Sequence, residues 1–369
     1  MGSIRLGCVT LALAVIACGP PPPKKQKTPV VDAVASTSAE EAGPFTPKKL
    51  TLERGAMGTR VVISTFTTPD IDEAAGTLAL GEAFTEIKRI EELMSTWIAT
   101  SEVSQINEGA GGPAIKIGPE TFDVLTRSVH VAQASEGVFD VTFEAMKGLW
   151  KFDEGAEPNI PPKEKIEEAR KRIDYRTIEL DSAARTARLR DKGRLINLGG
   201  IAKGFAVDRA STALEKRGIK SYFVQAGGDL FVRGRKFDGA PFRVGIRDPR
   251  GKSETDFFAA MEVEDRAFST AGDYERAFIK DGRRYHHIID PRTGYPSTAS
   301  RSVTVWAEDA FTADALDDAV FILGPEKGLA LIEGTPGAGA VIVDEANKVW
   351  ISSRLQGRVF VNHPPTDGP

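Results

Sequence analysis

The sequence predicts an α+β fold with mostly antiparallel sheets, and two observations support this prediction. First, strand-like segments are joined by short turns, as at Asp281-Gly282 between residues 277–280 and 284–289, and a turn this short joins antiparallel neighbours. Second, segments with apolar residues at helical spacing stand apart from these hairpins. The chain therefore lacks the regular alternation of strand and helix that a parallel βαβ fold requires.

The individual elements follow from the spacing of apolar residues. Alternation predicts a first strand over residues 59–66 that opens at Met57, and helical spacing predicts helices over 71–94 and 121–133. Residues 163–172 are charged on nearly every face, so we expect a solvated helix there. Further strands are expected at residues 178–180, 187–189, 194–198, 222–225, 230–232, 242–246, 257–268 and 302–307. A helix over 313–323 and a hairpin of 340–343 with 348–352 complete the domain.

Composition is that of a globular protein with a large core. The chain has 369 residues, of which 41% are hydrophobic and 27% charged, which fits one large domain or two. The net charge of -4 argues against a nucleic-acid partner, because proteins that bind nucleic acid usually carry a strong basic excess.

The N-terminal segment is expected to direct export and anchoring. Arg5 and the apolar run 6–17 are typical of a signal peptide, and the run is too short for a stable membrane-spanning helix. Residues 15–18, Val-Ile-Ala-Cys, resemble a bacterial lipobox, in which the cysteine is acylated before cleavage. We therefore expect a lipoprotein signal peptide over residues 1–17, a lipid on Cys18 and a location on the periplasmic side of a bacterial membrane. A plain signal peptide cut nearby is the alternative.

The remaining domain boundaries follow from composition. Residues 18–48 contain four consecutive prolines followed by lysines and cannot bury a core, so we expect a disordered linker. The folded domain is expected over 49–363, with a tail at 364–369. Cys8 lies in the leader, so the mature chain would contain no disulfide.

A glycine turn in residues 196–208 is the most informative local feature. An apolar stretch ends at Leu198, and a helix is expected to begin near Ile201. Gly199 and Gly200 have no Cβ and let a ligand approach the backbone, while Lys203 could reach a phosphate. The spacing of a P-loop is absent. The alternative is a plain strand-to-helix turn with a surface lysine.

Three carboxylates are a candidate metal site. Asp314, Asp317 and Asp318 are spaced i, i+3 and i+4, so a helix places them on one face. A hard divalent cation would relieve their mutual repulsion. Alternatively, the positive end of the helix macrodipole attracts acids to a helix N-terminus without any metal.

Two adjacent histidines are candidates for acid–base chemistry. His286 and His287 lie on an expected strand and must point to opposite faces. A strand histidine is often only a half-buried, satisfied ring. The rigid turn at 290–294 (Asp-Pro-Arg-Thr-Gly) would present His287 beside a cleft.

Several segments together resemble a known family. They are Met57-Gly58-Thr59, Ser95-Thr96-Trp97, Gly137–Thr142, Ile196–Asp208, Gln225–Asp229, Ser269–Tyr274, His287–Gly294 and Ala313–Leu316. In this order they closely resemble the ApbE-like flavin transferases, the magnesium-dependent FAD:protein FMN transferases. The resemblance covers roughly Leu50 to Phe360. It implies one catalytic unit of two interlocked α/β lobes, with the flavin in the cleft between them.

The resemblance also implies roles for individual residues. His287 would be catalytic, and Mg²⁺ would be held by Asp314, by the side chain at position 318 and by the backbone carbonyl of Gly200. Asp317 is a candidate metal ligand from its spacing alone. The implied FAD contacts are Met57, Trp97, Val138, Phe139, Asp140, Asn197, Lys203 and Ile288. Trp97 and Phe139 could stack on the flavin, although aromatic residues are more often core. Residues 227–229 and 269–272 are secondary candidates.

Two residues depart from the family pattern. Asn197 stands where the family usually has aspartate, and Asp318 where it usually has threonine. The first change turns a charged contact into a neutral hydrogen bond. The second adds a carboxylate, which can still ligate Mg²⁺ but could change the metal choice.

The implied reaction transfers FMN from FAD to a threonine or serine hydroxyl of an acceptor protein and releases AMP. Lys203 would offset phosphate charge, and His287 would be the base for the hydroxyl. The expected partners are FAD, an exported redox protein as acceptor and, through the lipid, a membrane; no nucleic acid is expected. The alternatives are an FAD pyrophosphatase and a non-catalytic flavin-binding lipoprotein.

Overall fold

The computed structural model describes residues 45–152, 155 and 157–368. Its main element is an eight-stranded sheet with the order β1-β2-β6-β7-β10-β15-β16-β17. These strands are β1 (Lys49–Ala56), β2 (Thr59–Phe66), β6 (Tyr222–Ala226), β7 (Asp229–Arg233), β10 (Arg266–Gly272), β15 (Ser300–Ala307), β16 (Gly339–Asp344) and β17 (Val349–Ile351). All neighbouring pairs in this sheet are antiparallel, so the predicted fold class is confirmed.

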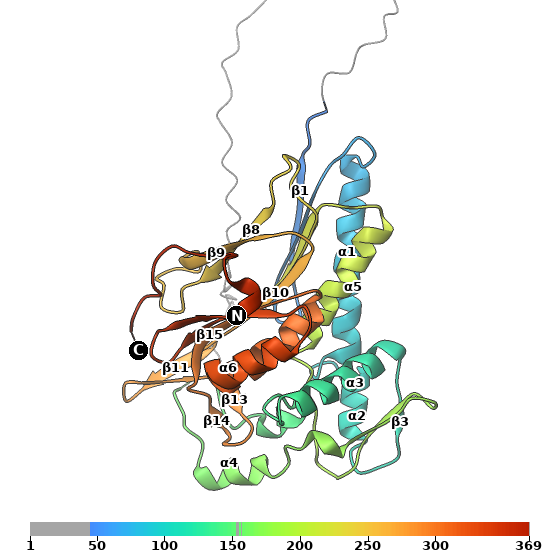
Figure 1. Cartoon of the computed structure of the whole chain (residues 1–369). Coiled ribbons are helices and arrows are strands. Elements are labelled where there is room, and N and C mark those ends of the chain that lie inside the picture. Colours follow the sequence, from blue (N-terminus) through green and yellow to red (C-terminus); the bar gives the residue numbers. More distant parts are fainter. Residues whose placement is uncertain (1–44, 153–154, 156, 369) are drawn as a thin grey trace, which may run out of the picture.

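The two faces of the sheet border two different hydrophobic cores. Helices α1 (Glu73–Met94), α5 (Ala202–Lys216) and α6 (Ala310–Gly334) cover one face (Figure 1). The other face packs against a three-stranded sheet of β8 (Phe242–Arg247), β9 (Phe257–Val263) and β18 (Val359–Val361). Strand β10 serves both cores, because successive side chains point to opposite faces. Ala267 and Ala271 lie in the helix-side core, and Phe268 in the other.

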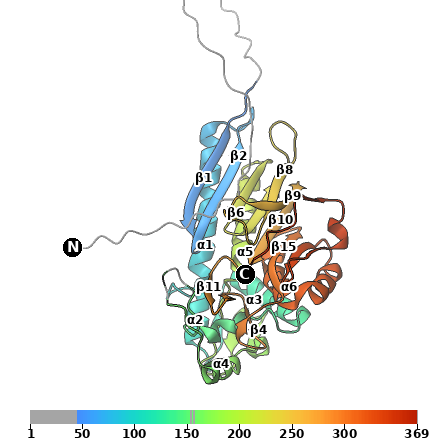
Figure 2. The ribbon, with the colours of Figure 1, turned by 90° about the vertical axis from the view of Figure 1, so that its left-hand side faces the viewer.

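The segment between α1 and α5 forms the second part of the molecule, at the lower end in Figures 1 and 2. Its elements are α2 (Glu102–Glu108), β3 (Ile115–Lys116), α3 (Pro119–Ala134), η1 (Val141–Met146), α4 (Lys163–Arg170), η2 (Tyr175–Thr177), β4 (Ile178–Asp181) and β5 (Thr186–Leu189). Two short hairpins, β11 (Ala277–Lys280) with β12 (Arg283–His286) and β13 (Ile289–Asp290) with β14 (Tyr295–Pro296), also contribute to it. Tyr285 and Tyr295 from these hairpins pack against Trp150 in a small aromatic core. The segment that follows α1 therefore folds outside the main sheet, and the chain re-enters that sheet at β6.

Four sequence predictions need correction. Strand β1 precedes the expected first strand, and Met57 and Gly58, with φ of 52° and 69°, form the tight turn between β1 and β2, as expected for a two-residue hairpin. The single strand expected at 257–268 is two strands, β9 and β10, because the chain bends at Glu264-Asp265 and passes from the three-stranded sheet to the eight-stranded one. Residues 194–198 join no sheet. Helix α6 is also longer than expected and is kinked at Gly324, where φ is 75°.

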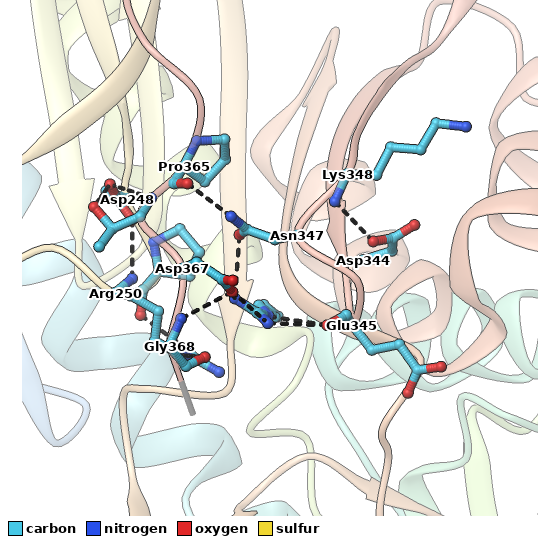
Figure 3. A network of polar contacts seen from close by, with 12 residues as sticks. Asp248, Arg250, Asp344, Glu345, Asn347, Lys348, Pro365, Asp367 and Gly368 are labelled. Carbon is cyan, nitrogen blue, oxygen red and sulfur yellow. Dashed lines mark hydrogen bonds and ion pairs between the residues drawn. The ribbon is translucent and has the colours of Figure 1, made fainter.

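The segment expected as a C-terminal tail is attached to the fold through polar contacts (Figure 3). The Thr366 amide and hydroxyl donate to Asp248 Oδ2 at 2.9 and 2.7 Å. Asn347 donates to the Pro365 carbonyl at 2.7 Å. Residues 364–368 thus lie against the loop after β8 and the turn between β16 and β17.

The expected leader cannot be described from the structure. Residues 1–44, which include Cys18, lie outside the described residues. Within the described part of the chain, no helix has both the length and the apolar character needed to cross a membrane.

Helices α5 and α6 touch at Gly204. A Cβ on Gly204 would stand 2.2 Å from the Ala310 carbonyl oxygen and 2.8 Å from Cβ of Asp314. Only glycine lets the two helix backbones approach this closely. The contact sets the position of α6, and therefore of the carboxylates on it, relative to the glycine turn before α5.

We predict that Gly204→Ala lowers the free energy of unfolding by about 1–3 kcal/mol, because the added methyl group overpacks this contact. Gly81→Ala is the matched control. Gly81 lies in α1, and nothing stands within 4 Å of its added Cβ, so alanine should stabilise the helix by up to about 1 kcal/mol. Urea unfolding followed by circular dichroism measures both. Equal stability of Gly204→Ala and wild type would contradict the close contact.

Candidate active site

The glycine turn ends in helix α5, as predicted. The Leu198 carbonyl accepts hydrogen bonds from the amides of Ile201 and Ala202 at 3.0 and 2.8 Å. Asn197 Oδ1 accepts from the Gly199 amide at 2.7 Å. This local hydrogen bonding fixes the turn at the beginning of the helix.

Asn197 also ties the turn to the second part of the molecule. Its backbone amide donates to the Val141 carbonyl at 2.8 Å, and its Nδ2 donates to Oε2 of buried Glu144 at 2.8 Å. Lys147 Nζ lies 2.7 Å from the other Glu144 oxygen. The side chain of Asn197 therefore holds the turn in place through protein contacts.

The acidic face of α6 begins after the first turn of the helix. Asp208 of α5 accepts from the first two α6 amides, Ala310 and Phe311, at 2.8 and 3.0 Å. The N-cap Asp309 accepts from the Thr312 amide at 2.7 Å. The first turn of α6 holds no acidic residue, and Asp314 follows it. The helix-dipole interpretation of the carboxylates is therefore wrong, because other aspartates already cap this terminus.

Three buried carboxylates meet behind the glycine turn. Asp229, Asp314 and Asp317 each offer an oxygen, and these atoms lie within 4.8 Å of one another. The side chains are buried, at 1%, 2% and 4% relative exposure. Within this group Asp314 and Asp317, with Asp318 next to them on α6, offer the carboxylate oxygens that a hard divalent cation takes. Asp229, at the start of β7, was only a secondary candidate from the sequence.

Lys203 provides the positive charge of this cluster. Its Nζ lies 2.8 Å from Asp229 Oδ2 and 3.1 Å from Asp314 Oδ1. Although burial opposes it, attraction by these carboxylates raises the pKa of Lys203 well above its usual range. Lys203 is therefore part of the buried cluster, which rules out the surface-lysine interpretation.

The surroundings of Asp314 and Asp317 disfavour the ionised form of both carboxyl groups. Burial and the neighbouring Asp229 raise the pKa of Asp314 to about 7. Burial, with Asp318 and Asp314 nearby, raises that of Asp317 well above its usual range. The Ser269 hydroxyl lies 2.6 Å from both Asp229 Oδ1 and Asp317 Oδ2, so its single hydrogen serves only one of them. One positive charge does not neutralise this group.

Asp318 faces the glycine turn from the neighbouring position on α6. A Cβ added to Gly200 would stand 3.1 Å from Asp318 Oδ2 and 3.6 Å from the Phe139 ring. Burial raises the pKa of Asp318 to about 6. The structure thus places Gly200 and Asp318 together, beside the cluster of Asp229, Asp314 and Asp317.

The two histidines differ in their surroundings. His286 is buried at 3% relative exposure, and its Nε2 lies 2.7 Å from the Ser297 carbonyl oxygen. Its Nδ1 accepts from the Ile288 amide at 3.3 Å, which fixes a neutral ring with the hydrogen on Nε2. His287 lies just after β12, not on the expected strand, and is exposed. Its amide donates to the Arg276 carbonyl at 3.1 Å.

His287 is an uncharged imidazole at neutral pH. The protein atoms around the ring disfavour the imidazolium form, and His286 and Arg276 add to this effect, which together lower the pKa of His287 to about 3. Lys203 acts in the same direction, so the ring lies within electrostatic reach of the buried cluster. An accessible neutral imidazole can accept a proton.

The remaining candidate FAD contacts fall into two groups. The first group is Met57 and Trp97. Met57 lies in the β1–β2 turn, and its amide donates a hydrogen bond to Glu91 Oε1 at 2.7 Å. Trp97 has 85% relative exposure. Lys147 Nζ stands 4.9 Å from the Trp97 ring centre, which connects Trp97 with the Glu144–Asn197 contact. An aromatic ring this exposed can stack on a planar ligand.

The other group is buried. Val138, Phe139 and Ile288 have 2–6% relative exposure and belong to the helix-side core. Asp140 accepts from Thr142 and from the Tyr175 amide, each amide contact at 2.8 Å. Burial raises the pKa of Asp140. Of these buried residues, Phe139 is the one whose ring edge lies near Gly200.

The fold and the site together define a class of protein: a mixed α and β protein with a buried carboxylate–lysine cluster beside a glycine turn. Comparison with known proteins then gives the family. The model of the ApbE family matches residues 57–342, which is more than half of the chain. The protein therefore belongs to the ApbE family.

Individual relatives agree with this assignment. A protein named FAD:protein FMN transferase from Treponema pallidum is 34% identical over 299 residues, covering 77% of this chain and 82% of the relative. One of the same name from Vibrio cholerae is 32% identical, covering 73% and 81%. The crystal structure of the ApbE protein from Thermotoga maritima superposes with a TM-score of 0.76 at 33% identity, covering 84% of this chain and 99% of that one. The flavin transferase ApbE from Vibrio cholerae gives 0.75 at 28% identity, covering 85% and 100%.

We predict that the two histidines differ in their effect on stability. His286→Ala should lower the free energy of unfolding by about 1–3 kcal/mol, because it leaves the buried Ser297 carbonyl without its donor. His287→Ala should change it by less than about 0.5 kcal/mol, as expected for an exposed side chain. Urea titrations measure both. A comparable loss in the two variants would show that His287 is also structural.

Proposed function

We propose that this protein transfers FMN from FAD to a threonine or serine hydroxyl of an acceptor protein, requires Mg²⁺ and releases AMP. The cluster of Asp229, Asp314, Asp317 and Lys203 carries this proposal. A diphosphate bound with a divalent cation needs carboxylates for the metal and an ammonium for the phosphate oxygens. Helices α5 and α6 and strand β7 bring both to one place, and the relatives named FAD:protein FMN transferase give the reaction class.

Different residues of the site would bind the metal, the phosphate and the flavin ring. Asp314, Asp317 and Asp318, with the Gly200 carbonyl, would hold Mg²⁺, whose charge would neutralise the diphosphate. Lys203 would bind a phosphate oxygen. The exposed Trp97 ring would stack on the isoalloxazine.

His287 is the proposed base for the acceptor hydroxyl. In the transfer, the hydroxyl oxygen forms a bond to the phosphorus of the FMN half, the diphosphate P–O bond breaks, and AMP leaves. The hydroxyl proton passes to a base. The lowered pKa of His287 keeps its ring neutral in the free protein, and the negative charge of a bound diphosphate would raise that pKa toward the range in which imidazole accepts a proton.

The test is whether AMP release depends on the acceptor. Purified protein is incubated with FAD and Mg²⁺, with and without candidate exported redox proteins, and AMP and covalently bound FMN are measured by mass spectrometry. Transfer predicts AMP in equal amount to protein-bound FMN, and little without acceptor. Rapid release of AMP and free FMN from FAD alone would identify a pyrophosphatase. FAD binding with no AMP under any condition would identify a flavin-binding protein without turnover.

We predict that removal of the Asp314 carboxylate abolishes metal-dependent turnover. Asp314→Ala should lower AMP release at least about a hundredfold, because a water ligand cannot replace its charge. Asp318→Thr should remain active, with a changed preference between Mg²⁺ and Mn²⁺, because a neutral oxygen replaces the carboxylate. Asp318→Ala should be impaired. AMP release against metal concentration measures all three variants, and near-normal metal dependence of Asp314→Ala would place the metal elsewhere.

We also propose that Cys18 anchors the mature protein by a lipid to the periplasmic side of a bacterial membrane. The support is the sequence of the apolar run and its lipobox-like end. The linker 18–48 would then hold the domain away from the lipid surface.

We predict that Cys18→Ser yields either a soluble form or an unprocessed precursor. Membrane fractionation and intact-mass measurement distinguish these products from the acylated wild type. If the variant is processed to normal size and still sediments with membranes, the lipid anchor is not at Cys18.

A further inference from the structure

Asp229 is the member of the buried carboxylate cluster that does not lie on α6. It begins β7 directly after the turn Gly227-Gly228. Gly227 has a φ of 62°, and a Cβ on Gly228 would stand 2.9 Å from the Thr270 carbonyl oxygen. The two glycines fit the turn tightly against β10, so the position of Asp229 is set by the sheet and is independent of the helix that carries Asp314.

Both carboxylate oxygens of Asp229 already contact protein donors. Oδ1 lies 2.6 Å from the Ser269 hydroxyl, and Oδ2 lies 2.8 Å from Lys203 Nζ. The residue has 1% relative exposure, so water does not solvate its charge. A buried carboxylate is tolerated only when it is paired, and Lys203 is the cation that pairs with it.

Lys203 is shared between two carboxylates that differ in their proposed task. The second contact, to Asp314 Oδ1, is 3.1 Å long, and Asp314 is a proposed metal ligand. A divalent cation on Asp314 would repel the ammonium from that carboxylate. The contact with Asp229 would still hold Lys203 in the site.

We propose that Asp229 is a positioning residue that keeps Lys203 beside the metal site, ready for the FAD diphosphate, and is not itself a metal ligand. The identity of the diphosphate and the metal rests on the proposed function. The Lys203–Asp314 contact is then the one that the metal replaces. Lys203 and Mg²⁺ compete for Asp314, whereas Lys203 and Asp229 act as a unit.

This arrangement makes FAD binding and metal binding respond differently to substitution. Isothermal titration calorimetry of the purified protein with FAD in the presence of saturating MgCl₂, and separately with MgCl₂ without FAD, measures the two affinities. The variants are Asp229→Asn, Lys203→Met, the double variant and Asp314→Asn. Asp248→Asn is the matched control, because Asp248 is also a buried aspartate but accepts hydrogen bonds from the C-terminal segment.

We expect Asp229→Asn and Lys203→Met each to weaken FAD binding about tenfold, the effect of losing one charge-assisted contact. In the Lys203→Met background, Asp229→Asn should weaken FAD no further, since a residue that acts only through another has no separate effect. Lys203→Met should tighten Mg²⁺ binding, because the competing cation is gone. Asp314→Asn should abolish Mg²⁺ binding, and Asp248→Asn should leave both affinities unchanged.

Three results would overturn the proposal: loss of Mg²⁺ binding in Asp229→Asn as complete as in Asp314→Asn, additive effects of the two substitutions on FAD affinity, or unchanged FAD affinity in Asp229→Asn. If Asp229→Asn does not fold, Ser269→Ala replaces it, since it removes the hydroxyl that contacts both Asp229 and Asp317 without changing the charge of either. Ser269→Ala should also weaken FAD binding, and unchanged affinity counts against the proposal. If wild type binds FAD but no Mg²⁺, the metal requirement of the proposed function fails, while the FAD measurements still decide the role of Asp229.

Discussion

The backbone of α5 lies against the beginning of α6 at Gly204, where a Cβ would be 2.2 Å from the Ala310 carbonyl oxygen. The same approach lets the Gly204 amide donate to Asp314 Oδ2 at 2.8 Å. One turn further along α5, Asp208 caps the first amides of α6. Helix α5 therefore provides the end of the glycine turn, the lysine of the site and part of the cap of the acidic helix. A shift between the two helices would displace all of these together.

The buried cluster shows why this close contact matters for function. Carboxylates are costly to bury, and the raised pKa values of Asp314 and Asp317 reflect that cost. Lys203 supplies one positive charge to a group of three carboxylates. A protein that needed only stability could use apolar side chains here at little loss. The imbalance is consistent with a site that receives a further cation.

Local patterns predicted much of the fold, and long-range pairing accounts for what they missed. The strand at 59–66 and the hairpin around Asp281-Gly282 appear as expected, because alternation and turn chemistry are local signals. Strand β1 was missed because it lies at the sheet edge, exposes most of its residues and alternates only two large apolar side chains, Leu50 and Leu52, with polar ones. The turn between β9 and β10 needs φ of 51° at Asp265, which the sequence does not mark with a glycine.

The same limit applies to the site. The spacing of Asp314 and Asp317 on one helix was visible in the sequence, and the structure places both in one cluster. Asp229 and Ser269 reach that cluster from neighbouring strands β7 and β10. Their approach depends on strand pairing across about forty residues of chain, and no local pattern encodes such pairing. The preceding glycines were the available signal, since they indicated a turn that fits closely against another strand.

The two departures from the family pattern lie on either side of the glycine turn. Asn197, where the family usually has a carboxylate, accepts from the Gly199 amide, and Asp318, where the family usually has a hydroxyl, faces Gly200. Asn197 can donate to buried Glu144 at 2.8 Å, whereas an aspartate there would place two carboxylates in contact. The amide at 197 thus suits Glu144, and Asp318 places a carboxylate opposite Gly200, beside the cluster that is proposed to bind the metal.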